Sequence, residues 1–196
     1  MSRKVLDILT STGGVVIVVV LVVAGVLLTW GHSFVSSNVR SQLAQQQIYF
    51  PPKAAFAHPN GTEITRSMIP TVSQYAGQEL LTGAQAKVYA DNFIAVHLSE
   101  MPDHGVYSKL SAAYLANPKN AQIATFRQES FMGTTLRGLL LEAYAFSEVG
   151  TIMLWGAIAS FILAALMSVL VGLGFWHARR TEPEAALLRS RAVPVA

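Results

Sequence analysis

The sequence predicts an all-α protein in which two transmembrane helices continue into an extracytoplasmic helical bundle. Two uncharged apolar segments, residues 8–30 and 149–176, lie near the two ends of the 196-residue chain. Between them, apolar residues recur every three or four positions, and no stretch alternates polar and apolar residues as a strand would. A helix of about 23 residues reaches about 34 Å, enough to cross about 30 Å of hydrocarbon.

These observations divide the chain into five parts. The parts are a cytoplasmic N-terminus (1–7), a first transmembrane helix (8–33), an extracytoplasmic all-helical domain (34–148), a second transmembrane helix (149–176) and a basic cytoplasmic tail (177–196). The tail is basic and short, with no room for an effector domain, and we expect it to be disordered. The domain of about 115 residues is long enough to bury a modest core.

The charge distribution sets the predicted orientation. The formal net charge of +3 lies on the two short flanks, because the central region carries equal numbers of basic and acidic residues. Basic residues beside a span stay in the cytoplasm, whereas a long loop can cross whatever its charge. We therefore expect a plasma-membrane protein with both termini cytoplasmic, and no nucleic-acid partner. Trp30 and Trp176 are expected at the membrane interfaces, with Arg179 and Arg180 as anchors that also meet anionic lipid.

The residue content excludes several kinds of chemistry and processing. The sequence has no cysteine, which excludes disulfides, thiolate metal sites and a cysteine nucleophile. The first apolar segment begins like a signal peptide, but Thr29-Trp30-Gly31-His32 offers no small-x-small cleavage site. We therefore expect the segment to be retained as a membrane anchor.

The first span is predicted to run on as an amphipathic helix to about Gln47. Its apolar residues Val35, Val39 and Leu43 fall four positions apart. Pro51 and Pro52 then end the helix, since proline cannot continue one. Residues 53–61 are expected to form a loop that closes in a Pro-Asn-Gly turn.

Further helices are predicted at about 72–81, 83–100 and 106–115, and from 119 through the second span. Thr82 and Gln85 have the spacing of a capping box at the start of the second of these. Asn117 is expected to cap the last helix, because Pro118 would then occupy its first position. Gly133 is a candidate for a bend in that helix.

One cluster has the residue types of a metal site. His97, Glu100 and His104 could supply two imidazoles and a carboxylate, the ligand set of a facial metal triad. The alternative, which we favour, is an ordinary helix end, where histidine suits the helix dipole. Nucleophile and phosphate-binding motifs are absent from the sequence. We therefore expect no enzymatic activity, no cofactor and no resident metal.

Small residues recur every four positions in the second span, an arrangement that lets another helix approach closely. They are Gly156, Ser160, Ala164, Ser168 and Gly172. Their partner is either the first span, through Gly25 and Thr29, or a helix of another protein; we favour the first span. Neither span contains a charged residue, which argues against an ion or proton path. Arg137 and Glu142 are expected to form a polar pair, or part of a partner contact, near the outer interface.

Two stretches carry a resemblance to a known group of proteins. They are YADxFIAVHL, which begins at Tyr89, and TTLRGLLLxAYAF, which begins at Thr134. From the first span through Arg180 the chain resembles uncharacterised two-span membrane proteins of actinobacteria, some of which are labelled ring-opening dioxygenases. The resemblance implies a lineage, a two-span topology and a cell envelope that extends beyond one plasma membrane. It implies no activity and no catalytic residues, and only the His97 cluster could support the dioxygenase label.

Three functions remain open on the sequence. The first, which we favour, is an accessory, assembly or stabilising subunit of a larger plasma-membrane complex, with membrane lipids and other integral membrane proteins as partners. The second is a stand-alone envelope sensor, or a module that binds lipid or a small molecule. The third is a metal-dependent enzyme that uses His97, Glu100 and His104.

Overall fold

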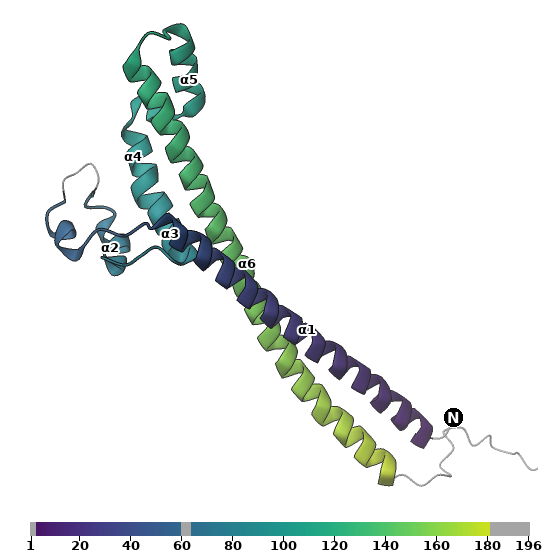
Figure 1. The fold of residues 1–196 in the computed structure, drawn as a ribbon. Helices are drawn as coiled ribbons and strands as arrows, with labels where there is room; N and C mark the ends of the chain where they lie inside the picture. Colours follow the sequence, from purple (N-terminus) through teal and green to yellow (C-terminus); the bar gives the residue numbers. More distant parts are fainter. Residues whose placement is uncertain (1–2, 60–63, 181–196) are drawn as a thin grey trace, which may run out of the picture. The chain divides into compact units, whose positions relative to one another are not determined.

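The structure is a computed structural model that describes residues 3–59 and 64–180, and it confirms an all-α protein. Its two long helices are α1 (Arg3–Gln46) and α6 (Ala121–Arg180), shown in Figure 1. Each contains a segment that is long and apolar enough to cross a membrane. The predicted turn at Asn60 and Gly61 and the predicted tail from residue 181 lie outside the described residues.

The chain divides into two compact units. We call the first the helix-pair unit; its described residues are 3–32 of α1 and 152–180 of α6. We call the second the central unit; its described residues are 33–59 and 64–151.

In the helix-pair unit, both helices turn small and aliphatic residues toward each other at alternating spacings of three and four. In α1 these less exposed positions are Ser11, Gly14, Val18, Leu21, Gly25 and Leu28, and in α6 they are Met153, Ala157, Ser160, Ala164, Met167, Val171, Gly174 and Ala178. This heptad spacing is typical of two helices that cross at a shallow angle.

Glycine brings the two helices close at several levels of this seam. A Cβ atom added at Gly25 would lie 2.8 Å from the Phe161 ring, and one added at Gly31 would lie 2.9 Å from the Met153 sulfur. On α6, Gly174 faces Ser11 in the same way. The order of these contacts along the two chains makes the pair antiparallel.

The outward faces of the helix-pair unit carry large apolar side chains that nothing in the unit covers. They include Val16, Val20, Val23 and Leu27 on α1 and Ile152, Leu166, Val169 and Leu170 on α6. Hydroxyl groups on these segments donate to carbonyls one turn earlier: Thr12 to Ile8, Thr29 to Gly25 and Ser168 to Ala164. These three hydroxyl groups are thus satisfied within their own helix, as a lipid environment favours.

The central unit is built on an antiparallel pair of helical rods. One rod consists of α3 (Gly83–Tyr89), the π-helical turn η3 (Ala90–Ile94) and α4 (Ala95–Glu100), and the other is α6 (Figure 1). Contacts along them pair Gly83 with Ser147, Lys87 with Tyr144, Asp91 with Arg137 and Gly133 with Leu98. Beyond the turn η4 (Pro102–Gly105), α5 (Tyr107–Ala116) leads back to the start of α6.

The segment between α1 and α3 wraps an aromatic centre. It contains η1 (Lys53–Ala57), α2 (Ile69–Val72) and η2 (Ser73–Tyr75). Backbone bonds from Phe50 N to Gln78 O (2.9 Å) and from Leu80 N to Ile48 O (2.8 Å) hold its two ends together. The buried Phe50 ring packs against Tyr75, Tyr89 and Phe93 at centroid distances of 5.2, 5.7 and 6.3 Å.

Several predicted element ends are confirmed. The first helix ends at Gln46, and Gln47 follows with a left-handed φ of 53°. The capping box is present, since Gln85 N donates to Thr82 Oγ1 and Thr82 N donates to Gln85 Oε1. The helix that follows it ends at Glu100, before Pro102.

Two local predictions are wrong. The helix expected at 72–81 lies earlier, at 69–75, because Gly77 turns the chain with φ 71° toward an extended bridge between Tyr49 and Glu79. Asn120 caps α6 in place of Asn117: its Oδ1 accepts from the N–H groups of Gln122 and Ile123. At Gly133, α6 continues without a break.

We predict that Gly25→Leu destabilises the helix-pair unit, because any side chain at this position overlaps the Phe161 ring. Overpacking of this kind costs roughly 1–3 kcal/mol. Unfolding of the full-length protein in one detergent measures the loss. Gly13→Leu is the matched control on the same helix, since a Cβ there meets nothing within 4 Å. Equal unfolding midpoints for the two variants would contradict the packing.

Candidate functional site

The candidate site is a slot between the α3–α4 rod and α6 in the central unit. It encloses about 640 Å³, within the range of about 300–1,000 Å³ that is common for ligand pockets. The two rods supply most of its lining, and the segment after α1 closes one side. The lining residues are Tyr49, Pro51, Ala55, Ile64, Tyr89, Phe93, Ile94, His97, Leu98, Glu129, Met132, Gly133 and Leu136.

The two walls of the slot have different characters. Tyr89, Phe93 and His97 follow one another four residues apart on the first rod, and the rings of Tyr89 and Phe93 stack at 4.9 Å. Across the slot, Met132 and Leu136 give α6 an aliphatic wall. Burial raises the pKa of the Tyr89 hydroxyl, so this hydroxyl stays protonated at neutral pH.

Gly133 sets the closest approach of the two walls. A Cβ atom there would lie 2.9 Å from Leu98 Cδ2, so only glycine allows this spacing without a shift of the leucine. One turn of chain away, the buried Ser130 hydroxyl donates to the Gly105 carbonyl at 2.6 Å. These two contacts fix the end of the slot at which His97 and Glu129 stand.

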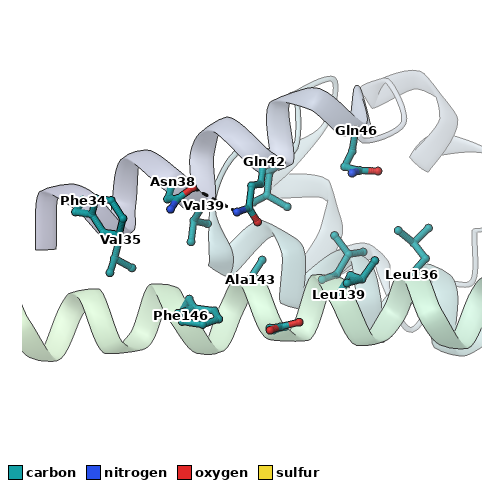
Figure 2. Close-up of a pocket in the computed structure, with 13 residues that line it drawn as sticks. Phe34, Val35, Asn38, Val39, Gln42, Gln46, Leu136, Leu139, Ala143 and Phe146 are labelled. Atoms are coloured by element: carbon teal, nitrogen blue, oxygen red, sulfur yellow. Dashed lines mark hydrogen bonds between the residues drawn. The ribbon is translucent and has the colours of Figure 1, made fainter. Parts of the chain in front are cut away.

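A second, smaller cavity of about 340 Å³ lies between α1 and α6 within the central unit (Figure 2). Amide side chains of Asn38, Gln42 and Gln46 line it from α1, and the Gln42 amide donates to Asn38 Oδ1 at 3.3 Å. Phe34 and Phe146 lie toward one end of it (Figure 2), and both rings are more than half exposed.

A charged cluster ties the first rod to α6 beside the slot. The Asp91 carboxylate accepts from Lys87 Nζ at 2.7 Å and from Arg137 Nη2 at 3.1 Å. The hydrogen bond from Lys87, followed by that from Arg137 and by both positive charges, lowers the pKa of Asp91 against the opposing effect of burial. The same bond raises the pKa of Lys87, whose ammonium also lies 5.4 Å from the centre of the Tyr144 ring.

The predicted polar pair of Arg137 with Glu142 requires a correction. Residues five apart on an α-helix point about 140° away from each other, and Arg137 instead meets Asp91 on the neighbouring rod. Glu142 lines the smaller cavity beside the α1 amides. Asp91 was missed, although its i,i+4 spacing from Lys87 is a recognisable signal of a helical ion pair.

The structure separates the three candidate metal ligands. His97 lines the slot, whereas His104 lies in a left-handed turn with φ 54°, its Nδ1 3.2 Å from the Ser99 carbonyl. Within residues 3–59 and 64–180, no three His, Asp or Glu side chains gather closely enough to hold a metal ion. Glu100 is exposed at the end of α4.

The small-residue stripe only partly follows the seam of the helix-pair unit. Ala164 is buried and Gly156 and Ser160 are partly covered, but Ser168 and Gly172 are exposed. A four-residue repeat drifts about 40° per step around an α-helix, so it leaves a face that has heptad spacing. On α1, Gly25 meets Phe161 rather than the stripe, and Thr29 donates to the Gly25 carbonyl.

The predicted interface residues lie at the ends of the apolar segments. Trp30 and Trp176 are both exposed. The Arg180 guanidinium lies 4.0 Å from the centre of the Trp176 ring, and Arg179 is exposed beside it.

No protein-family model, curated protein or solved structure matches this chain. Its functional features are therefore those of its own geometry: the slot, the smaller cavity and the charged cluster. The slot itself was not foreseen from the sequence, because its residues come from three separate stretches. The one available signal was the i,i+4 series of Tyr89, Phe93 and His97, which resembles an ordinary core face.

We predict that the charged cluster makes stability fall in acid. A carboxylate whose pKa is lowered on folding contributes fully above its ordinary pKa of 3.8, and that contribution is lost as the pH falls through the folded pKa. Asp91→Asn should therefore lower the melting temperature at pH 7 and flatten its decline below about pH 4. Lys87→Met, which removes the larger cause, should move the decline toward the ordinary pKa. An unchanged acid profile in Asp91→Asn would contradict this assignment.

Proposed function

We propose that this chain is a non-enzymatic integral membrane protein that acts as an accessory, assembly or stabilising subunit of a larger plasma-membrane complex. In this proposal residues 8–33 and 149–176 cross the membrane, the central unit is extracytoplasmic and both termini are cytoplasmic. The resemblance to two-span actinobacterial proteins would place it in the cell envelope of that group.

The exposed faces of the helix-pair unit support a membrane location. In the most apolar 18-residue stretch of each long helix, only 11% is buried inside the protein. Soluble proteins rarely expose so many neighbouring large apolar side chains. Lipid contact is the environment in which such faces are stable, and the basic residues beside the apolar segments favour cytoplasmic termini.

An exposed aromatic patch on the central unit is the observation that carries the accessory role. We call Val106, Tyr107 and Phe131 the distal apolar surface. Each is more than two-fifths exposed, and the rings of Tyr107 and Phe131 lie 5.7 Å apart. Aromatic residues exposed on rigid helices are enriched in protein interfaces. This surface would contact the extracytoplasmic part of a partner subunit.

The open part of the small-residue stripe offers a second contact. Ser168 and Gly172 are exposed, and a Cβ atom at Gly172 would meet nothing within 4 Å. Small residues on a lipid-facing surface let a neighbouring transmembrane helix approach closely. A helix of the partner complex would pack here.

We predict that single cysteines report the proposed orientation. The chain has no native cysteine, so each introduced thiol is the sole target of a maleimide. Ser108→Cys, which is exposed on α5, should react with a membrane-impermeant maleimide in intact cells. His177→Cys, exposed near the end of α6, should react only after the cells are permeabilised. The reverse pattern would overturn the orientation.

We predict that the full chain, purified from its own membranes in a mild detergent, brings a fixed set of subunits at constant stoichiometry. Phe131→Asp should reduce their recovery about tenfold or more, because a charge in an aromatic contact costs over 1.4 kcal/mol of binding. Gln122→Asp is the control on the opposite face of α6, where the side chain is exposed. Recovery of this chain alone, or equal recovery with both variants, would refute the accessory role.

A further inference from the structure

We propose that the slot of the central unit binds a single-chain amphiphile with a positively charged amine head. The apolar chain would lie along the rings of Tyr89 and Phe93, and the head would meet the Glu129 carboxylate at the far end. This inference goes beyond the accessory role and does not depend on it, since it concerns a ligand of this chain alone.

The apolar part of the slot is elongated rather than round. Its aromatic wall runs from Tyr89 to His97, eight residues of helix, or about 12 Å at about 1.5 Å per residue. The opposite wall on α6 runs from Leu136 through Met132 to Glu129, seven residues or about 11 Å at the same rise. An elongated slot between two helical walls matches an alkyl chain better than a compact solute.

Polarity increases toward one end of the slot. The two rods are antiparallel, and Asp91 meets Arg137 while Leu98 meets Gly133. Glu129 therefore stands at the same end as His97, beyond the stacked rings. A molecule that fills the slot must be apolar along most of its length and polar at this end.

The charge at that end selects the head group. Glu129 is the one acidic or basic side chain, histidine aside, among the slot residues that the structure describes, and His97 is the second polar group there. Glu129 takes part in neither of the two ion pairs found among residues 3–59 and 64–180. A protonated amine would donate a charged hydrogen bond to this carboxylate, whereas a carboxylate head would be repelled.

The test is photolabelling of the full-length protein in lipid nanodiscs with dodecylamine that carries a diazirine in its chain. Peptide mapping gives the ratio of label on residues 89–98 and 129–136 to label on the two apolar segments, which report simple partitioning into lipid. We expect the slot ratio to exceed the ratio for the same chain with a carboxylate head by about tenfold, the effect of about 1.4 kcal/mol.

Two variants separate the chain from the head. Met132→Trp fills the slot and should abolish slot labelling. Leu139→Trp is the control and should leave slot labelling unchanged, because Leu139 lies outside the slot. The two side chains are similarly exposed, Met132 at 52% and Leu139 at 57%. Glu129→Gln should remove the preference for the amine while a hydroxyl-headed probe labels as before.

Two results would overturn the proposal. Slot labelling that survives Met132→Trp would show that the probe does not occupy the slot. Equal labelling by the amine and carboxylate probes in the wild type would show that Glu129 does not select the head.

Discussion

The close antiparallel packing of the α3–α4 rod against α6 is the constraint on which the rest of the central unit depends. The rods meet where side chains are smallest, at Gly83 beside Ser147 and at Gly133 beside Leu98. Between these points the Asp91 carboxylate and Arg137 bind across the seam. With the register fixed at three levels, the slot, the aromatic centre around Phe50 and the α5 hairpin all take their positions from it.

The helix-pair unit follows the same rule. Its helices also meet at small residues, with Gly25 beside Phe161 and Gly174 beside Ser11. Close approach at small residues is a common way for helices to associate in lipid, where apolar burial provides little drive for association.

The fold class was predictable from the sequence because contacts between residues far apart in the sequence contribute little to it. Helix ends followed from local chemistry where that chemistry was strong, as with Thr82 and Gln85, or the prolines after Gln47. They were misplaced where a distant contact decided the outcome. The extended pairing of Tyr49 with Glu79 shortened the expected helix at 72–81, and no local signal in that stretch reveals a partner some 30 residues away.

The candidate site was less predictable for the same reason. Arg137 was paired with a neighbour in sequence, whereas its partner comes from the other rod. Small residues at every fourth position looked like a packing face, but helices that cross at a shallow angle keep to alternating spacings of three and four. Sequence periodicity predicts which residues share one face of a helix. The slot is formed by two rods and a loop, and periodicity does not predict how these three segments come together.

The π-helical turn Ala90–Ile94 sets which way α4 faces relative to α3 in the first rod. A π turn holds one residue more than the α-helical turn it replaces. If the same residues were wound as a regular α-helix, without the wide turn, everything after Ile94 would rotate by about 100° relative to everything before it. Gly83 and Lys87 could then still face α6, but Leu98 would swing away from Gly133 and His97 would leave the slot. A single-codon deletion within 90–94 would restore a regular α-helix and leave both ends of the rod facing α6, so the wide turn is what lets the rod carry an extra residue and still line the slot.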